Sequence, residues 1–140
     1  MSFGNYPKQR PELPEAYKKI YTSWYRINRN GESQATSLSQ KMEQWLHRKV
    51  AQDVRHNDSL KTLEIGAGTL NQLMYESTRQ YDIVEPFQEL YESSPFKSRI
   101  GRIYTDISLI SDEQKYDRII AIACFEHICN LPDVVAKSKK

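Results

Sequence analysis

The stretch KTLEIGAGTLNQL, residues 61–73, decides the fold of this chain. A short apolar run that carries Glu64 leads into two glycines, Gly66 and Gly68, which stand one residue apart. Glycine permits the tight turn and the close backbone approach that a nucleotide-binding turn needs after a strand. The positions that follow, beginning at Leu70, lack the third glycine that such turns often carry. The stretch therefore predicts a nucleotide-binding turn and leaves open which nucleotide it holds.

Short apolar runs recur along the second half of the chain. Four strands are expected, over residues 62–65, 81–84, 102–105 and 118–123. The stretches between and after them suit helices, over roughly 69–79, 86–94 and 132–139. Strands that alternate with helices predict βαβ units and a parallel sheet, so the expected class is α/β. The last strand is rich in β-branched residues, which is typical of a strand buried on both faces.

The first half of the chain is polar and shows helical periodicity. Pro14 suits the first turn of a helix, and a second helix is expected to begin near Ser37, which resembles a capping-box residue. We expect the apolar stripe of each helix to be a packing face. These features divide the chain into a helical cap over 1–58 and a nucleotide-binding domain over 59–140. The stripes consist of Tyr17, Ile20, Tyr21, Trp24 and Tyr25, and of Leu38, Met42, Trp45, Leu46, Val50 and Val54.

Composition narrows the functional classes. The net charge is +2, with 20 basic and 18 acidic residues, which gives no broad footprint for nucleic acid or for an anionic membrane. The sequence has no apolar run long enough to cross a bilayer and no secretory signal. Cys124 and Cys129 form no disulfide framework, and too few Cys and His residues lie close together for a zinc site. We therefore expect a cytoplasmic protein without a metal that acts on a small molecule.

Acidic residues mark the ends of three predicted strands, where ligands bind in a doubly wound sheet. Glu85 lies 21 residues after Glu64, close to the offset at which an acid reaches ribose hydroxyls. Asp106 is placed to accept a hydrogen bond from an adenine amine. Glu64 directly precedes the glycine turn, so its charge would repel a pyrophosphate there. An acid at this place suits a ligand with an amine and a positive centre, and S-adenosylmethionine has both.

The segments TLEIGAGT, YDIVEP, YTDI and YDRIIAIACFEHI together resemble the class I S-adenosylmethionine-dependent methyltransferases, over residues 61 to about 135. The resemblance implies a partial Rossmann-like sheet of four parallel strands in the order 3-2-1-4, and S-adenosylmethionine as the cofactor. It also implies that residues before the first strand close over the site, with Tyr21, Tyr25 and Arg29 as candidates. The implied cofactor-binding residues are Glu64, Gly66, Ala67, Gly68, Glu85, Pro86, Asp106, Ile107, Ala123 and Cys124.

The sequence departs from that family in two respects. Leu70 stands where members often carry glycine, so its side chain either crowds the methionine tail or packs inward. The family's sheet also has more strands than the four predicted here, so we expect a truncated domain whose acceptor pocket lies beyond Lys140. The expected function is methyl transfer by the intact protein to an unidentified small molecule, with this portion inactive alone. No catalytic residue is assigned.

Other hypotheses remain. The portion could be a non-catalytic module that forms a homodimer or larger oligomer through the exposed edge strand 118–123. A nicotinamide dehydrogenase is disfavoured by Glu64 and by the missing glycine near Asn71. His127 beside Glu126 suits either a general base or local packing, and the pattern favours packing.

Overall fold

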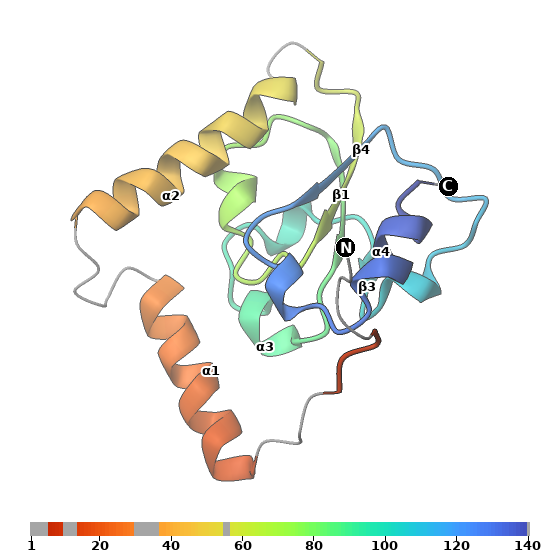
Figure 1. Ribbon diagram of the computed structural model, residues 1–140. Coiled ribbons are helices and arrows are strands. Elements are labelled where there is room, and N and C mark those ends of the chain that lie inside the picture. Colours follow the sequence, from red (N-terminus) through yellow and green to blue (C-terminus); the bar gives the residue numbers. More distant parts are fainter. Residues whose placement is uncertain (1–5, 10–13, 30–36, 55–56, 140) are drawn as a thin grey trace.

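A computed structural model describes residues 6–9, 14–29, 37–54 and 57–139 (Figure 1). Its centre is a four-stranded parallel sheet in the order β3-β2-β1-β4, which confirms the predicted architecture. The strands are β1 (Lys61–Ile65), β2 (Gln80–Val84), β3 (Ile103–Tyr104) and β4 (Arg118–Ala121). Ile65 at the end of β1 pairs with Val84 of β2 and with Ala121 of β4, so three strand ends lie level at one edge of the sheet.

The side chains of β1 alternate between two hydrophobic clusters, one on each face of the sheet. Leu63 and Ile65 pack with Val84, Ile107 and Ile110 on one face. The opposite face is covered by a second cluster, made of Ala67, Leu70, Leu73, Tyr81, Ile83, Tyr91 and Ile120. Because successive strand residues point to opposite faces, Glu64 points to the face that carries this second cluster. The central strand thus presents a carboxyl group to a face that carries this apolar cluster together with buried polar side chains such as Arg118 and Glu76.

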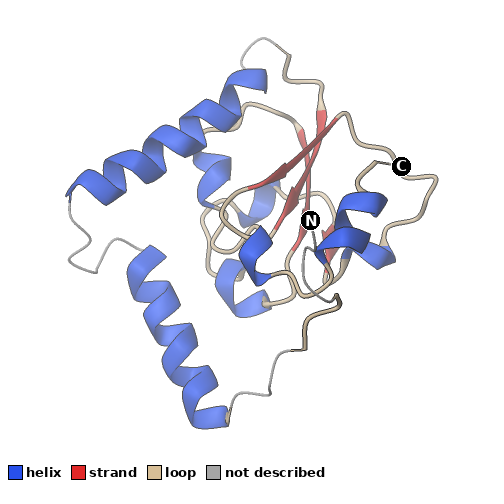
Figure 2. Cartoon of the chain, in the orientation of Figure 1, coloured by secondary structure: helices blue, strands red, loops and turns tan. Residues whose placement is uncertain are grey.

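The helical segments between and after the strands are shorter than the sequence predicts. They comprise the 3₁₀ turns η2 (Asn71–Met74), η3 (Lys97–Arg99), η4 (Ile107–Leu109) and η5 (Phe125–His127), and the helices α3 (Gln88–Tyr91) and α4 (Leu131–Lys137) (Figure 2). The helix predicted over 69–79 is wrong. Leu70 has a left-handed backbone (φ 66°), which is incompatible with the start of an α-helix there. The Arg99 guanidinium also donates to the carbonyls of Leu73 and Glu76, which a helix would have used.

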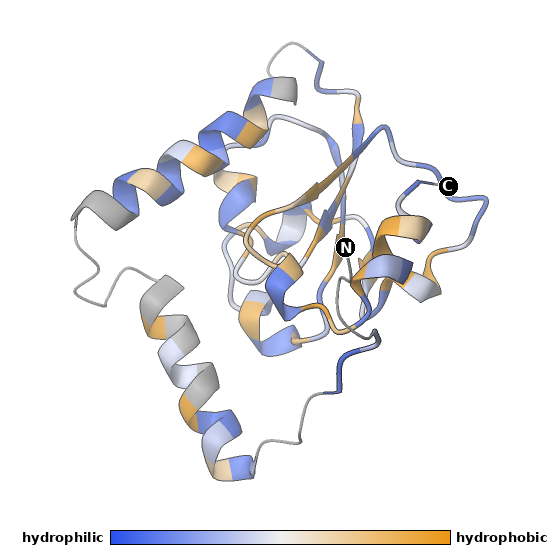
Figure 3. Cartoon of the chain, in the orientation of Figure 1, coloured by the Kyte–Doolittle hydropathy of each residue, from blue (hydrophilic) through white to orange (hydrophobic). Residues whose placement is uncertain are grey.

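The two predicted N-terminal helices are present as α1 (Glu15–Arg29) and α2 (Ser37–Val50), and a 3₁₀ turn, η1 (Ala51–Val54), extends α2. The prediction that both stripes are packing faces is wrong for six of their side chains, which are exposed: Tyr17, Ile20, Trp24, Met42, Trp45 and Leu46. Figure 1 shows α1 standing apart from the sheet, and Figure 3 shows hydrophobic and hydrophilic residues alternating along both helices. Among the side chains described in this region, His47 near the end of α2 and Ala51 in η1 are buried, and Val50 is partly buried against the sheet's apolar cluster.

Candidate functional site

The predicted glycine turn follows β1 and is built on two left-handed glycines. Gly66 has a φ of 72° and Gly68 a φ of 52°, a region that glycine enters without steric cost. Gly66 also donates its N–H to the Val84 carbonyl at 2.8 Å, which ties the turn to β2. A Cβ on Gly66 would lie 2.7 Å from the Cβ of Cys124, so even an alanine would clash with the segment after β4. The tight packing of the turn therefore requires glycine at this position.

Glu85, after β2, holds the turn from the neighbouring strand. Its Oε2 accepts from the Gly68 N–H at 2.8 Å and its Oε1 accepts from the Phe87 N–H at 3.0 Å. Burial raises the pKa of the Glu85 carboxyl, while the two N–H donors act in the opposite direction. Each carboxylate oxygen retains a further lone pair, so Glu85 can accept from a diol while it still holds the turn.

Glu64 lies beneath the turn and is only 3% exposed. The Tyr81 hydroxyl donates to its Oε2 at 2.8 Å. Burial raises the pKa of Glu64 to about 8, and the negative charges of Glu76 and Glu85 add to the rise. At neutral pH the carboxyl is therefore largely protonated. A cation beside it would favour the ionised form and lower this pKa.

A small cavity of about 20 Å³ separates Glu64 from the C-terminal part of α2. That volume holds about one water molecule, so the amino-acid part of a nucleoside ligand enters only if the walls move apart. Two buried polar atoms of its lining, Thr69 Oγ1 and His47 Nε2, have no hydrogen-bond partner among the described residues. An acid and two unsatisfied polar atoms fit the polar end of an amino acid. The lining consists of His47, Glu64, Gly66, Ala67, Gly68, Thr69, Asn71, Gln72 and Ile122.

A buried polar network behind this cavity escaped the sequence analysis. Arg118, at the start of β4, donates to both oxygens of Glu76 at 2.9 and 3.1 Å. Glu76 in turn accepts from the Gln72 amide, and Gln72 Oε1 lies 2.7 Å from Nδ1 of His47. The sequence offers one signal for this network: Arg118 is a charged residue at the start of a predicted buried strand, and such a residue needs a buried partner.

The residues after β3 lie at the same edge of the sheet but outside the cavity. Asp106 is exposed, and its Oδ1 accepts from the Ser108 N–H at 2.8 Å. Hydrogen bonds from the Ser108 hydroxyl and from this N–H hold the pKa of Asp106 below its usual value. Ile107 is buried against β1, whereas Pro86 is exposed. The Glu85 N–H donates to the Tyr104 carbonyl at 2.8 Å, so the β2 and β3 ends adjoin. Asp106 and Pro86 thus lie on the Glu85 side of the sheet edge, outside the lining of the small cavity.

The segment after β4 completes the back of the turn. Ala123 has a left-handed backbone (φ 49°), and the Cys124 thiol donates to the Ile65 carbonyl at 3.1 Å. Burial raises the pKa of the Cys124 thiol to about 11, with nearby acids adding to it. A protonated thiol is a poor nucleophile, so Cys124 packs against the turn rather than reacting. His127 and Glu126 are both largely exposed and 3.8 Å apart, and neither lines the cavity.

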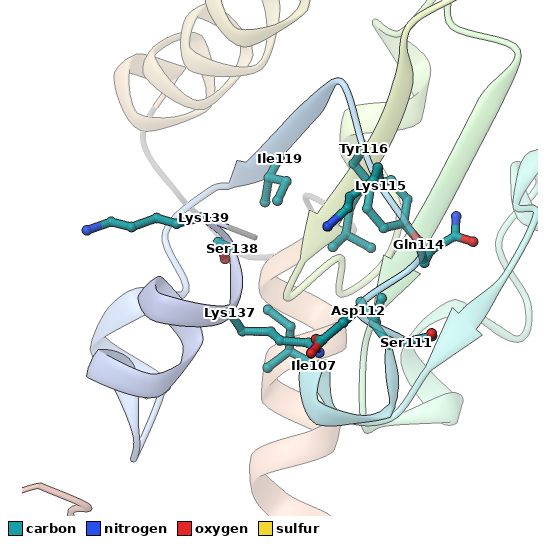
Figure 4. A pocket seen from close by; sticks show the side chains of 12 residues that line it. Ile107, Ser111, Asp112, Gln114, Lys115, Tyr116, Ile119, Lys137, Ser138 and Lys139 are labelled. Carbon is teal, nitrogen blue, oxygen red and sulfur yellow. The ribbon is translucent and has the colours of Figure 1, made fainter.

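A larger hollow of about 200 Å³ lies elsewhere, between β4, η4 and α4. Figure 4 shows Lys137 reaching from α4 toward Asp112, with Tyr116 and Ile119 on the opposite side. Of the predicted cofactor-binding residues, Ile107 alone lines it, and Glu64 and Glu85 do not. The larger hollow is therefore separate from the glycine turn and from most of the residues predicted to bind a cofactor.

The lid candidates Tyr21, Tyr25 and Arg29 have side chains outside the described parts of the structure. Within the described ranges, no group of three His, Cys, Asp or Glu side chains is arranged to hold a metal ion. None of the helices described is both long enough and apolar enough to cross a membrane. No family model, curated protein or solved structure matches this chain. The functional interpretation therefore rests on the chemistry of the residues themselves.

Proposed function

We propose that the chain binds S-adenosylmethionine at the glycine turn and belongs to a methyltransferase that acts on a small molecule in the cytoplasm. The observation that carries this proposal is the buried carboxyl of Glu64 under the turn. A pyrophosphate at this place would meet a buried acid, which disfavours dinucleotides. A ligand with an ammonium and a sulfonium lowers the pKa of Glu64 and ionises the carboxyl, and the opposite charges then attract strongly where water is excluded.

The chain's own residues would position the donor. Glu64 accepts from the ammonium, and Glu85 accepts from the ribose hydroxyls with its remaining lone pairs. When bound, S-adenosylmethionine supplies an electrophilic methyl group. Methyl transfer needs mainly alignment of donor and acceptor. The fixed glycine turn after β1 would support that alignment without a catalytic base among the assigned residues.

Calorimetry tests the proposal with S-adenosylhomocysteine and NAD as ligands. We expect S-adenosylhomocysteine to bind and NAD not to bind. Glu85→Ala should weaken binding of S-adenosylhomocysteine by about 1–3 kcal/mol, because a buried hydrogen bond to a charged group is lost. Asp112→Asn, in the larger hollow, serves as the control and should leave the affinity unchanged. Binding of NAD alone, or of neither ligand, would refute the proposal.

A second function, self-association, is favoured by one observation. Within the described chain, β4 pairs only with β1, so its other edge faces outward, and the Ile119 side chain is exposed. Unpaired strand edges invite pairing with another copy. Light scattering over a range of protein concentrations tests self-association. A dimer that Ile119→Lys dissociates supports pairing through β4. A monomer at high concentration contradicts it.

A further inference from the structure

The imidazole of His47 forms one wall of the small cavity, although α2 precedes the sheet in the sequence. The residue is 5% exposed, and its ring stacks on Tyr75 with centroids 5.8 Å apart and planes inclined by 11°. Its Nδ1 lies 2.7 Å from Gln72 Oε1, whereas its Nε2 is buried without a hydrogen-bond partner among the described residues. The Glu43 carboxylate on the same helix is 3.7 Å from Nε2, beyond hydrogen-bond distance.

The neighbours of Gln72 determine which nitrogen of His47 carries the proton. The Gln72 amide nitrogen lies beside a Glu76 carboxylate oxygen and 3.3 Å from the His47 backbone carbonyl, and both of these groups only accept. The amide NH₂ must therefore face them, which turns Gln72 Oε1 toward the ring. An oxygen acceptor requires a donor, so Nδ1 carries the hydrogen. In the neutral ring, Nε2 is then a buried lone-pair acceptor on a side chain that lines the cavity.

The network behind Gln72 keeps this arrangement in place. Arg118 holds Glu76 through two hydrogen bonds and also donates to the Val50 carbonyl near the end of α2. Partners of this kind fix both the orientation and the tautomer of an imidazole, as they do for histidines that bind metals. The His47 ring is thus locked by Tyr75 stacking on one side and by the Gln72 hydrogen bond on another.

An acceptor that shares a cavity with an acid suits a primary ammonium, which has three N–H donors and no acceptor. We infer that His47 binds the α-ammonium of the ligand's amino-acid part, with Nε2 accepting one hydrogen bond and Glu64 accepting another. The inference rests on the proposed function. The geometry behind it is the unsatisfied Nε2, the buried Glu64 carboxyl and the cavity that both line. Helix α2 would then form part of the binding site as well as cover it.

Calorimetry with three ligands tests the inference. They are S-adenosylhomocysteine, its deaminated analogue, which keeps the carboxylate, and 5′-methylthioadenosine, which lacks the amino-acid part. His47→Phe keeps a ring to stack on Tyr75 and removes both nitrogens. This variant should weaken S-adenosylhomocysteine binding by about ten- to a hundredfold, the usual effect of losing a hydrogen bond to a charged group. It should leave the other two affinities unchanged. Trp45→Phe, on the exposed face of the same helix, is the control and should change none of the three.

Other outcomes separate the inference from the proposed function. An equal loss for all three ligands would show a structural role for His47 and overturn the inference. A similar loss for the deaminated analogue would place Nε2 at the carboxylate and also overturn it. If the wild type binds none of the ligands, the proposed function fails, and the inference with it.

A spectroscopic measurement on the wild type avoids any folding defect of the variant. In ¹⁵N NMR of the imidazole, the free protein should show the hydrogen on Nδ1. Addition of S-adenosylhomocysteine should shift the Nε2 resonance in the direction of a newly accepted hydrogen bond, and 5′-methylthioadenosine should not. A hydrogen on Nε2 in the neutral ring, or no response to S-adenosylhomocysteine, would overturn the inference.

Discussion

Replacing Glu64 by glutamine should stabilise the protein at neutral pH while weakening binding of the cofactor. In the folded protein the pKa of Glu64 is raised from 4.5 to about 8, chiefly by burial. Between these two values the folded state keeps a proton that the unfolded state has lost, so stability falls as the pH rises. Each pH unit in this window costs about 1.4 kcal/mol, which amounts to about 3 kcal/mol at pH 7. Glutamine resembles the protonated acid and still accepts from the Tyr81 hydroxyl.

Urea unfolding of wild type and Glu64→Gln at pH 5, 6, 7 and 8 measures this effect. The two proteins should have similar free energies of unfolding near pH 5, and the variant should become progressively more stable toward pH 8. Glu113→Gln removes an exposed carboxyl and should not reproduce this divergence. Parallel curves for wild type and Glu64→Gln over the whole range would show that Glu64 is not desolvated, and would refute the reasoning.

Three further predictions concern the surroundings of the turn. Arg118→Met leaves Glu76 buried without its cation and should lower the free energy of unfolding by about 3–5 kcal/mol. Arg118→Met combined with Glu76→Leu should recover much of the lost stability. If urea unfolding shows no recovery in the double variant, the buried ion pair is contradicted. Leu70→Ala should destabilise by about 2–5 kcal/mol because the side chain is fully buried. Leu70→Gly should be no worse, because a left-handed backbone favours glycine by about 1–2 kcal/mol; a glycine variant clearly less stable than the alanine variant would contradict this backbone. The Cys124 thiol should react with iodoacetamide at pH 8 much more slowly in the folded than in the unfolded protein, because burial raises its pKa; equal rates would contradict that burial.

The strand positions were predictable because each strand is a short apolar run bounded by polar residues, whereas their order came from the resemblance to a known family. The places of Glu64 near the end of β1 and of Glu85 after β2 follow from the strand positions. Leu70 shows the limit of such reasoning. Its hydrophobicity fits either proposed role, and only the structure shows that it packs inward, fully buried, while its backbone ends the glycine turn. A helical pattern over 69–79 did not reveal that Arg99 competes for the carbonyls of that segment.

The sequence indicates that Arg118 needs a buried partner but not which residue this is, because Arg118 and Glu76 are 42 positions apart in the sequence. Local periodicity does not report such contacts. The amphipathic stripe of α1 shows a second limit. Its helical pattern predicts the helix correctly but does not predict what the apolar face of the helix contacts. Tyr17 and Trp24 are exposed although their spacing is typical of a packed face.

Proton release on binding tests the central claim most directly, that the α-ammonium of the ligand's amino-acid part binds beside Glu64. Binding of S-adenosylhomocysteine should be measured by calorimetry at pH 7 in buffers of different ionisation enthalpy. Because the ligand ammonium favours the ionised carboxyl, binding should release close to one proton, and the affinity should rise as the pH approaches 8. In Glu64→Gln the release should disappear. Tight binding without proton release, equal in wild type and Glu64→Gln, would contradict the account.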